Sequence, residues 1–288
     1  MARRERERGG RGPAGEDRPV PGRLPDQLVA DLVDAGSREH YLDPALYDYE
    51  YRRRRADVTF YRELARRRGA DRILELGAGT GRVTVPLARD GRQVVAIDRS
   101  EPMITRLRER IARLPPAAAG RITPVLGDLR SFAAGRRFPL AIAAFNVLEH
   151  LYTRGEVTAC LQRIAAHLEP GGAFAFDVQL PDLYSTNHDY DPISQIALIR
   201  LYYEPDDPGQ GRPGHGGRAG DRAGTRVVQL SQRKFFPAEL EALVAHAGFR
   251  VAERYGDFLF RPLDATADSQ VLVCEPLPGR GRFRAVSG

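Results

Sequence analysis

The segment RILELGAGTGRVTVPLARDGRQVVAIDRS, residues 72–100, decides the fold of this chain. Residues 73–76 form an apolar run broken only by Glu75, as expected for a buried parallel strand. Three glycines and a helical pattern follow, and a second apolar run then ends on Asp98. The segment therefore predicts a β-turn-α-β unit. Its glycine-rich turn lies at the carboxyl end of the first strand, where open α/β sheets bind ligands.

The residues of this turn indicate a nucleoside ligand. Gly77, Gly79 and Gly81 allow a tight turn and let the backbone approach a ligand without an intervening Cβ. The helix that begins after them offers unpaired N–H groups to an anionic part of the ligand. Asp98 follows Gly77 by 21 residues, and a carboxylate at that strand tip can accept hydrogen bonds from both ribose hydroxyls.

The spacing of the glycines separates two classes of nucleoside ligand. The dinucleotide fingerprint GxGxxG has a glycine where this chain has Arg82, whereas the turn here is spaced GxGxG and follows Glu75. The segment ELGAGTG, residues 75–81, resembles the first motif of class I S-adenosylmethionine (SAM)-dependent methyltransferases. The resemblance implies an α/β, Rossmann-like, doubly wound sheet of seven strands, the last antiparallel. It also implies SAM as cofactor and S-adenosylhomocysteine as product, with Glu75 helping to hold the amino end of the methionine part.

A second motif resembles the adenine site of the same family. The sequence Gly127-Asp128-Leu129 follows a predicted strand over 121–126. In the family, the equivalent of Asp128 accepts from the adenine N6 amine and the N–H of the next residue donates to N1. The alternative is that Asp128 only caps its own turn.

A predicted helix that begins at Ser100, its expected cap, supplies another part of the cofactor site. Met103 in this helix resembles the apolar residue that the family places under the adenine. The family usually has an aliphatic residue where this chain has Arg99, but the stem of Arg99 could still cover the purine.

The segment before the first strand is predicted to be a helical lid over residues 24–70. Residues 25–35 have an amphipathic pattern, and a second helical pattern runs from Asp43-Pro44 to Arg68. Tyr47 and Tyr51 match the YDxxY stretches of sugar N-methyltransferases, where a tyrosine approaches the sulfonium. Cation–π attraction of about 0.5–2 kcal/mol would favour that contact. The alternative is that both tyrosines simply pack the helix against the core.

The end of the predicted strand 138–145 is where class I enzymes hold the transferred methyl. Phe145 and Asn146 occupy this end. DNA and glutamine methyltransferases carry (D/N)PPY there, and the different sequence after Asn146 disfavours nucleobase amines and glutamine as acceptors. His150 is the candidate general base, because its ordinary pKa lies near neutrality. A histidine satisfied by its own neighbours is the alternative.

The second half of the chain is predicted to complete the domain, which spans residues 24–278. Strand-like segments within 180–235 flank a glycine-rich loop and form an insertion that covers the substrate. A solvated flap is the alternative. A helix from Pro237 and a closing strand pair follow. Asp177 lacks nearby acidic partners, so no metal is predicted. The candidate substrate contacts of the insertion are Asn187, His188, Arg200, Tyr202 and Tyr203.

The charge of the chain is concentrated at its ends. The formal net charge of +6 comes from seven Arg against four acids in residues 1–23 and three Arg without an acid in residues 279–288. Both tails are predicted to be disordered. Residues 24–278 are formally neutral, so no specific nucleic-acid partner is predicted. The sequence predicts no secretory signal and no membrane-spanning run. Two separated cysteines predict a reducing, cytoplasmic setting, and a homodimer is left open.

Together these observations predict methyl transfer from SAM to an oxygen, nitrogen or carbon nucleophile of a small molecule. The alternatives are a methyltransferase that acts on protein or RNA, and a SAM-binding protein without catalysis. The predicted catalytic residue is His150. The predicted cofactor contacts are Tyr47, Tyr51, Glu75, Gly77, Ala78, Gly79, Gly81, Asp98, Arg99, Met103, Asp128, Leu129, Phe145 and Asn146.

Overall fold

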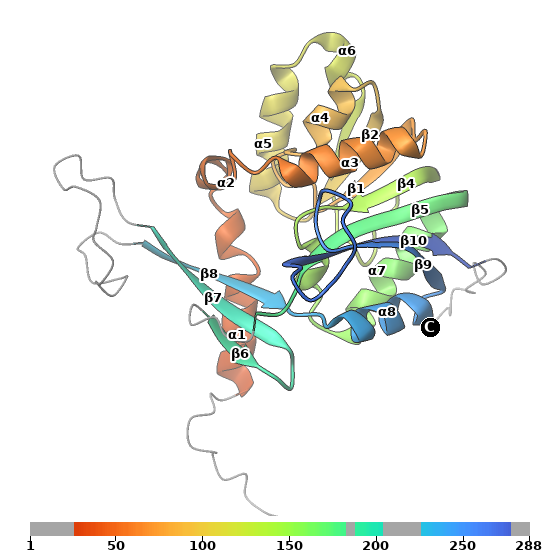
Figure 1. Cartoon of the computed structure of the whole chain (residues 1–288). Helices are drawn as coiled ribbons and strands as arrows, with labels where there is room; N and C mark the ends of the chain where they lie inside the picture. The colour runs from red at the N-terminus through yellow and green to blue at the C-terminus, as the bar shows by residue number, and fades with distance from the viewer. Residues whose placement is uncertain (1–25, 183–187, 204–225, 278–288) are drawn as a thin grey trace, which may run out of the picture.

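The computed structural model describes residues 26–182, 188–203 and 226–277, which form a central sheet, helices on both of its faces and a smaller sheet (Figure 1). The predicted tails 1–23 and 279–288, most of the glycine-rich loop and Asn187 lie outside the described residues.

The central sheet has seven strands in the order β3-β2-β1-β4-β5-β10-β9. All neighbouring pairs are parallel except those that β10 makes with β5 and β9. The predicted doubly wound sheet with an antiparallel last strand is therefore confirmed. The strands are β1 (Arg72–Leu76), β2 (Gln93–Asp98), β3 (Ile122–Leu126), β4 (Phe138–Ala143), β5 (Leu168–Gln179), β9 (Phe249–Tyr255) and β10 (Ser269–Pro276).

Side chains alternate between the two faces of this sheet and build a separate core on each. On β1, Ile73 joins the cluster that contains Tyr61 and Leu107, whereas Leu74 joins the cluster that contains Val157 and Leu240. Figure 1 shows the corresponding helices on opposite sides of the sheet. They are α3 (Ala56–Arg67), α4 (Thr84–Arg89), α5 (Glu101–Ala112) and α6 (Pro116–Ala119) on one side, and α7 (Arg154–His167) and α8 (Pro237–His246) on the other.

The lid differs from its prediction. The expected continuous helix from residue 44 to 68 is wrong, because α2 (Pro44–Glu50) ends and α3 begins after an irregular turn. Four adjacent arginines, residues 52–55, occupy that turn, and the like charges of Arg52 and Arg55, three residues apart, disfavour a helix. The buried Asp57 then accepts hydrogen bonds of 2.7 and 2.6 Å from the Arg82 guanidinium, which fixes α3 beside the glycine turn.

The insertion forms a three-stranded antiparallel sheet against the first helix, α1 (Asp26–Gly36). Its strands are β6 (His188–Asp191), β7 (Ile196–Tyr203) and β8 (Arg226–Arg233), of which β6 was not predicted. The end of α1 approaches β8 closely, since a Cβ on Gly36 would lie 2.7 Å from the backbone nitrogen of Ser231. The insertion also reaches α2, where the Tyr203 hydroxyl donates to Glu50 at 2.8 Å.

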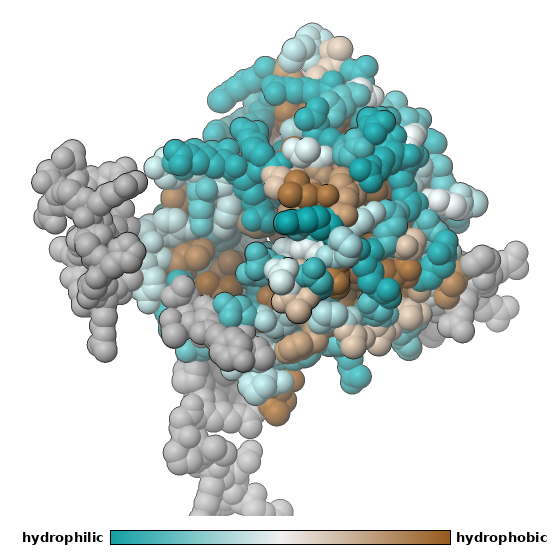
Figure 2. All heavy atoms as spheres, in the orientation of Figure 1, coloured by the Kyte–Doolittle hydropathy of each residue, from teal (hydrophilic) through white to brown (hydrophobic). Residues whose placement is uncertain are grey.

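The face of the molecule in Figure 2 is mostly hydrophilic, with hydrophobic side chains in separate small patches. Within the described ranges, no helix has both the length and the apolar composition to cross a bilayer.

Candidate cofactor and acceptor site

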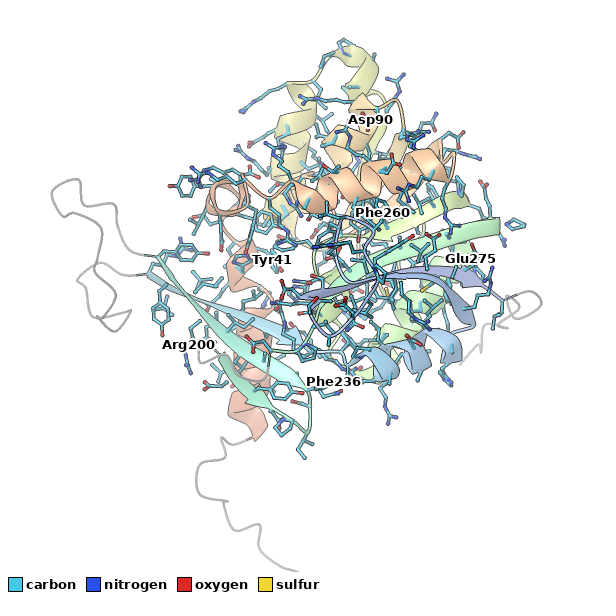
Figure 3. All side chains as sticks on the ribbon, viewed as in Figure 1. Tyr41, Asp90, Arg200, Phe236, Phe260 and Glu275 are labelled. Carbon is cyan, nitrogen blue, oxygen red and sulfur yellow. The ribbon has the colours of Figure 1, made fainter. Side chains whose placement is uncertain are left out.

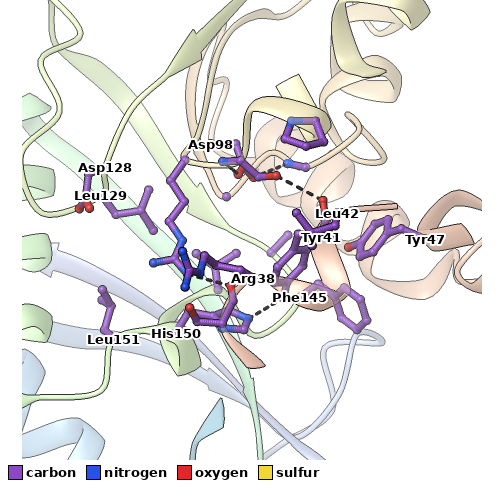
Figure 4. A pocket seen from close by; sticks show the side chains of 18 of the residues that line it. Arg38, Tyr41, Leu42, Tyr47, Asp98, Asp128, Leu129, Phe145, His150 and Leu151 are labelled. Carbon is purple, nitrogen blue, oxygen red and sulfur yellow. Dashed lines mark hydrogen bonds between the residues drawn. The ribbon is translucent and has the colours of Figure 1, made fainter. Parts of the chain in front are cut away.

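A cavity of about 370 Å³ lies at the carboxyl ends of β1, β2 and β4, beneath the lid (Figure 4). This volume is in the range of small-ligand pockets. The cavity therefore occupies the place at which open α/β sheets bind ligands. Its lining residues are Ser37, Arg38, Tyr41, Leu42, Tyr47, Gly77, Gly79, Asp98, Arg99, Ser100, Pro102, Asp128, Leu129, Arg130, Ala144, Phe145, Val147, His150 and Leu151.

The glycine turn needs glycine at two positions for packing and at a third for access. Gly77, Gly79 and Gly81 all have positive φ angles, of 65°, 55° and 84°. A Cβ on Gly77 would overlap Val147, and one on Gly81 would overlap Leu107. A Cβ on Gly79 would meet no atom within 4 Å, so this glycine borders the open cavity.

Asp98 is oriented by two backbone N–H groups at the tip of β2. Its Oδ2 accepts from Gly79 N at 2.8 Å and its Oδ1 accepts from Ser100 N at 2.9 Å. Burial raises the pKa of this carboxyl, although both N–H groups oppose that effect. Each oxygen keeps a second lone pair, so the carboxylate can receive two further donors from the cavity. Ser100 begins α5 as expected, but its side chain makes no capping hydrogen bond.

The predicted adenine side is occupied by charged contacts. Asp128 accepts from the backbone nitrogen of Arg130 at 2.8 Å, so it does cap its own turn. The Arg130 guanidinium also pairs with it at 2.5 Å, which lowers the pKa of Asp128. Arg99 donates to the carbonyl of Ser37 at 2.8 Å and so joins the cavity wall to the lid.

Aromatic rings surround the end of the cavity next to β4. The ring centroids of Tyr47 and Tyr51 are 4.7 Å apart, and those of Tyr51 and Phe145 are 4.8 Å apart. Burial raises the pKa of Tyr47 to about 12, so its phenol stays neutral at physiological pH. Tyr47 and Phe145 line the cavity, whereas Tyr51 lies behind them.

His150 contacts a tyrosine that the sequence did not single out. The Tyr41 hydroxyl lies 2.6 Å from His150 Nε2, and both side chains line the cavity (Figure 4). Burial lowers the pKa of His150 to about 3, so its imidazole is neutral at physiological pH. Tyr41 lies in the short 3₁₀ turn η1 (Glu39–Tyr41), and such a turn has no hydrophobic period that would have revealed it.

Phe145 and Asn146 adopt the left-handed conformation, with φ angles of 71° and 62°, so β4 ends two residues earlier than predicted. The buried carboxylate of Asp177 accepts from the backbone nitrogens of these residues at 2.9 and 3.3 Å. It also accepts from the Tyr61 hydroxyl at 2.6 Å. Asp177 therefore holds the turn that presents Phe145 to the cavity. Among the described residues, no three His, Cys, Asp or Glu side chains form a candidate metal site.

The lid is tied directly to the glycine turn through Asp48 of α2. Its Oδ1 accepts from the Thr80 hydroxyl at 2.6 Å, and its Oδ2 accepts from Arg106 Nε at 2.9 Å. Arg110 donates to the Thr80 carbonyl at 3.0 Å. These four residues, which we call the Asp48 latch, join α2, the glycine turn and α5.

Several predicted cofactor contacts lie behind the cavity wall. Glu75 is buried and accepts from the Thr84 hydroxyl at 2.6 Å, and burial raises its pKa to about 7. Met103 of α5 is fully buried and does not line the cavity. The predicted residues that are not part of the lining are Tyr51, Glu75, Ala78, Gly81, Met103 and Asn146.

Among the candidate substrate contacts of the insertion, the described side chains of Arg200, Tyr202 and Tyr203 do not line the cavity. Arg200, labelled in Figure 3 on the small sheet, is exposed and pairs with Asp189 on the neighbouring strand. Tyr202 is exposed, and Tyr203 binds Glu50. His188 lies at the start of β6.

A second recess, of about 570 Å³, lies between the turn before α3 and the loop that joins β9 to β10. The Arg54 guanidinium lies on its wall, 5.6 Å from the ring centroid of Phe258 and 4.4 Å from that of Phe145. Phe145 therefore lines the cavity and also lies close to this second recess.

Comparisons with known proteins match parts of this chain to methyltransferases. Residues 73–172 match the family model described as a methyltransferase domain. A dTDP-3-amino-3,4,6-trideoxy-alpha-D-glucopyranose N,N-dimethyltransferase of Streptomyces venezuelae is 32% identical over 103 residues, which are 36% of this chain and 40% of that protein. The aligned part of this chain thus covers less than half of the length of the curated relatives it matches.

Solved structures match over more of the chain. The CcbJ methyltransferase of Streptomyces caelestis is 28% identical with a TM-score of 0.66, over 77% of this chain and 90% of that one. The glycopeptide N-methyltransferase MtfA, solved with SAM, is 22% identical with a TM-score of 0.58, over 77% of this chain and 87% of that one. This second likeness concerns the fold.

Proposed function

Because this chain carries a class I SAM-dependent methyltransferase domain, we propose that it transfers a methyl group from SAM to a nucleophile of a small-molecule acceptor. The observation that carries the proposal is the cavity in which the Asp98 carboxylate, the left-handed glycine turn and the aromatic rings meet. An amino nitrogen is the first acceptor atom to test, since relatives are named as N,N-dimethyltransferases of amino sugars.

The cavity residues fit the parts of SAM. The open side of Gly79 leaves room for the ligand, and the free lone pairs of Asp98 match two ribose hydroxyls. Leu129 would cover the adenine, with Asp128 and the N–H of Leu129 at its polar edge. For the Asp128 oxygens to accept from the adenine amine, the Arg130 guanidinium must share them.

The aromatic end of the cavity suits the reacting centre. When bound, SAM supplies a methyl group that is already activated on a sulfonium. The neutral rings of Tyr47 and Phe145 can attract that positive charge through their faces. The protein's main task is then to hold the nucleophile in line with the methyl, which can lower a barrier by about 7–11 kcal/mol.

We assign His150 and Tyr41 to the orientation of the acceptor. Because burial lowers its pKa to about 3, His150 stays uncharged at physiological pH and acts as a neutral hydrogen-bond acceptor. Tyr41 bridges this imidazole to the cavity. The recess beside Arg54 and Phe258 is the proposed approach for the acceptor, because Arg54 on its wall contacts Phe145, which lines the cavity.

The first experiment is calorimetry with SAM on the wild type, Asp98→Ala and Asp90→Ala. Asp98→Ala should lose about 1.5–3 kcal/mol of binding free energy, as expected for charge-assisted hydrogen bonds. Asp90 pairs with Arg62 on the surface, so Asp90→Ala should bind SAM like the wild type. A wild type that ignores SAM but binds a dinucleotide would overturn the proposal.

A cell extract incubated with labelled SAM then separates the classes of acceptor. Label in a low-mass fraction supports a small molecule. Label on RNA or protein supports a macromolecular acceptor, and SAM binding without any transfer supports a non-catalytic protein.

A further inference from the structure

A line of hydrogen-bonding groups runs from the lid to the cavity through the insertion. Ser231 Oγ of β8 donates to the Val33 carbonyl of α1 at 2.8 Å. The Tyr152 hydroxyl lies 2.7 Å from Ser231 Oγ and 3.5 Å from His150 Nδ1. His150 Nε2 in turn lies 2.6 Å from the Tyr41 hydroxyl, as the dashed line in Figure 4 shows.

The direction of each bond follows from the proton count. A carbonyl can only accept, so Ser231 uses its single hydroxyl proton on Val33. The Tyr152 hydroxyl therefore donates to Ser231, either to Oγ at 2.7 Å or to the backbone carbonyl at 3.1 Å. Because its one proton is used there, Tyr152 can only accept a hydrogen bond from His150.

From this order we propose that Tyr152 is a positioning residue that keeps the proton of His150 on Nδ1. A neutral imidazole then has its lone pair on Nε2, and the Tyr41 hydroxyl donates to it. The oxygen of Tyr41 is left with lone pairs toward the cavity. If the proposed function is correct, this oxygen accepts from the acceptor molecule, so the acceptor nucleophile carries an N–H or O–H. A carbon nucleophile is disfavoured.

The backbone that carries His150 is held independently of Tyr152. His150 ends the 3₁₀ turn η2 (Val147–His150), in which Glu149 is buried. Glu149 accepts from Lys234 Nζ at 2.7 Å and from the backbone nitrogen of Gln179 at 2.9 Å. Replacing Tyr152 by Phe should therefore remove its hydroxyl contacts without displacing the turn.

The test is long-range proton–nitrogen NMR on the full chain with ¹⁵N-labelled histidine, in the absence of SAM. The wild type should show His150, assigned with His150→Gln, as the Nδ1–H tautomer. Tyr152→Phe should lose this preference and show a mixture or the Nε2–H form. The signals of His167 on α7 and His246 on α8 should stay in place if the fold is intact.

Tyr49→Phe is the matched control, because Tyr49 is 58% exposed and lies away from the cavity lining. It should leave the tautomer of His150 unchanged. The inference is wrong if the wild type shows Nε2–H, or if Tyr152→Phe keeps the wild-type pattern with a folded spectrum.

The same samples separate this inference from the proposed function. Calorimetry with SAM should give equal affinity for the wild type and Tyr152→Phe, because Tyr152 does not line the cavity. A wild type that fails to bind SAM would refute the proposed function. The NMR result would still decide the tautomer.

Discussion

Asp177 holds the turn that presents Phe145 to the cavity. Its carboxylate accepts from two backbone N–H groups and the Tyr61 hydroxyl. Left-handed φ angles at Phe145 and Asn146 are unfavourable for side-chain-bearing residues, so they persist only where the surroundings fix them. A carboxylate that receives three donors supplies this fixation.

Asp177→Ala should lower the free energy of unfolding by about 3 kcal/mol or more, because each buried donor left without a partner costs about 1–3 kcal/mol. Urea denaturation of the protein without ligand measures this loss. The surface variant Asp90→Ala removes an exposed ion pair and should cost no more than about 1 kcal/mol. Equal losses in the two variants would contradict the role of Asp177.

At the scale of elements, the Asp48 latch holds α2 over the glycine turn. Its carboxylate joins the Thr80 hydroxyl to Arg106 of α5. The lid residues Tyr41 and Tyr47 line the cavity, so a ligand inside is enclosed by the element that the latch holds in place.

Asp48→Asn should raise the dissociation rate of SAM about tenfold, since the amide loses charge-assisted bonds that contribute about 1.5–3 kcal/mol to lid closure. Stopped-flow displacement of bound SAM measures this rate. Asp71→Asn, at an exposed position before β1, is the matched control and should dissociate like the wild type. A slower association with an unchanged dissociation rate would show that the latch does not hold the ligand in.

The elements also show where sequence reasoning reaches its limit. The sheet was predictable because residues 73–76 and the glycine turn are local patterns. The break between α2 and α3 was missed although the adjacent arginines 52–55 are a local signal for it, whereas the Asp57–Arg82 pair that fixes α3 forms only in the folded chain. The place of Tyr41 beside His150 also depends on segments more than a hundred residues apart. The predicted roles of the cavity residues toward SAM stay predictions.

At the scale of the whole molecule, buried carboxyls make stability depend on pH. Burial raises the pKa of Glu75 from 4.5 to about 7, so the folded protein holds this proton more tightly than the unfolded chain. The stabilisation that protonated Glu75 contributes is complete below about pH 4.5 and is lost as the pH rises through 7. Glu149 changes in the same direction, also because of burial.

Glu75→Gln should therefore reduce the fall in unfolding free energy between pH 5 and pH 8, and it should be more stable than the wild type at the upper end. Urea titrations at several pH values, without SAM, test this. Glu101→Gln, an exposed change on α5, should show the same dependence of unfolding free energy on pH as the wild type. If the unfolding free energy of Glu75→Gln also depended on pH as in the wild type, Glu75 would not titrate between pH 5 and pH 8.

The packing of α1 on β8 has a consequence for how the protein is made. The first described helix packs against a strand at residues 226–233, where Ser231 donates to the Val33 carbonyl. Most of the chain must leave the ribosome before α1 can dock, whereas β1 to β4 can pair much earlier. We therefore expect the Rossmann-like core to fold first during synthesis. The wall formed by Ser37, Arg38 and Tyr41 would then close the cavity last.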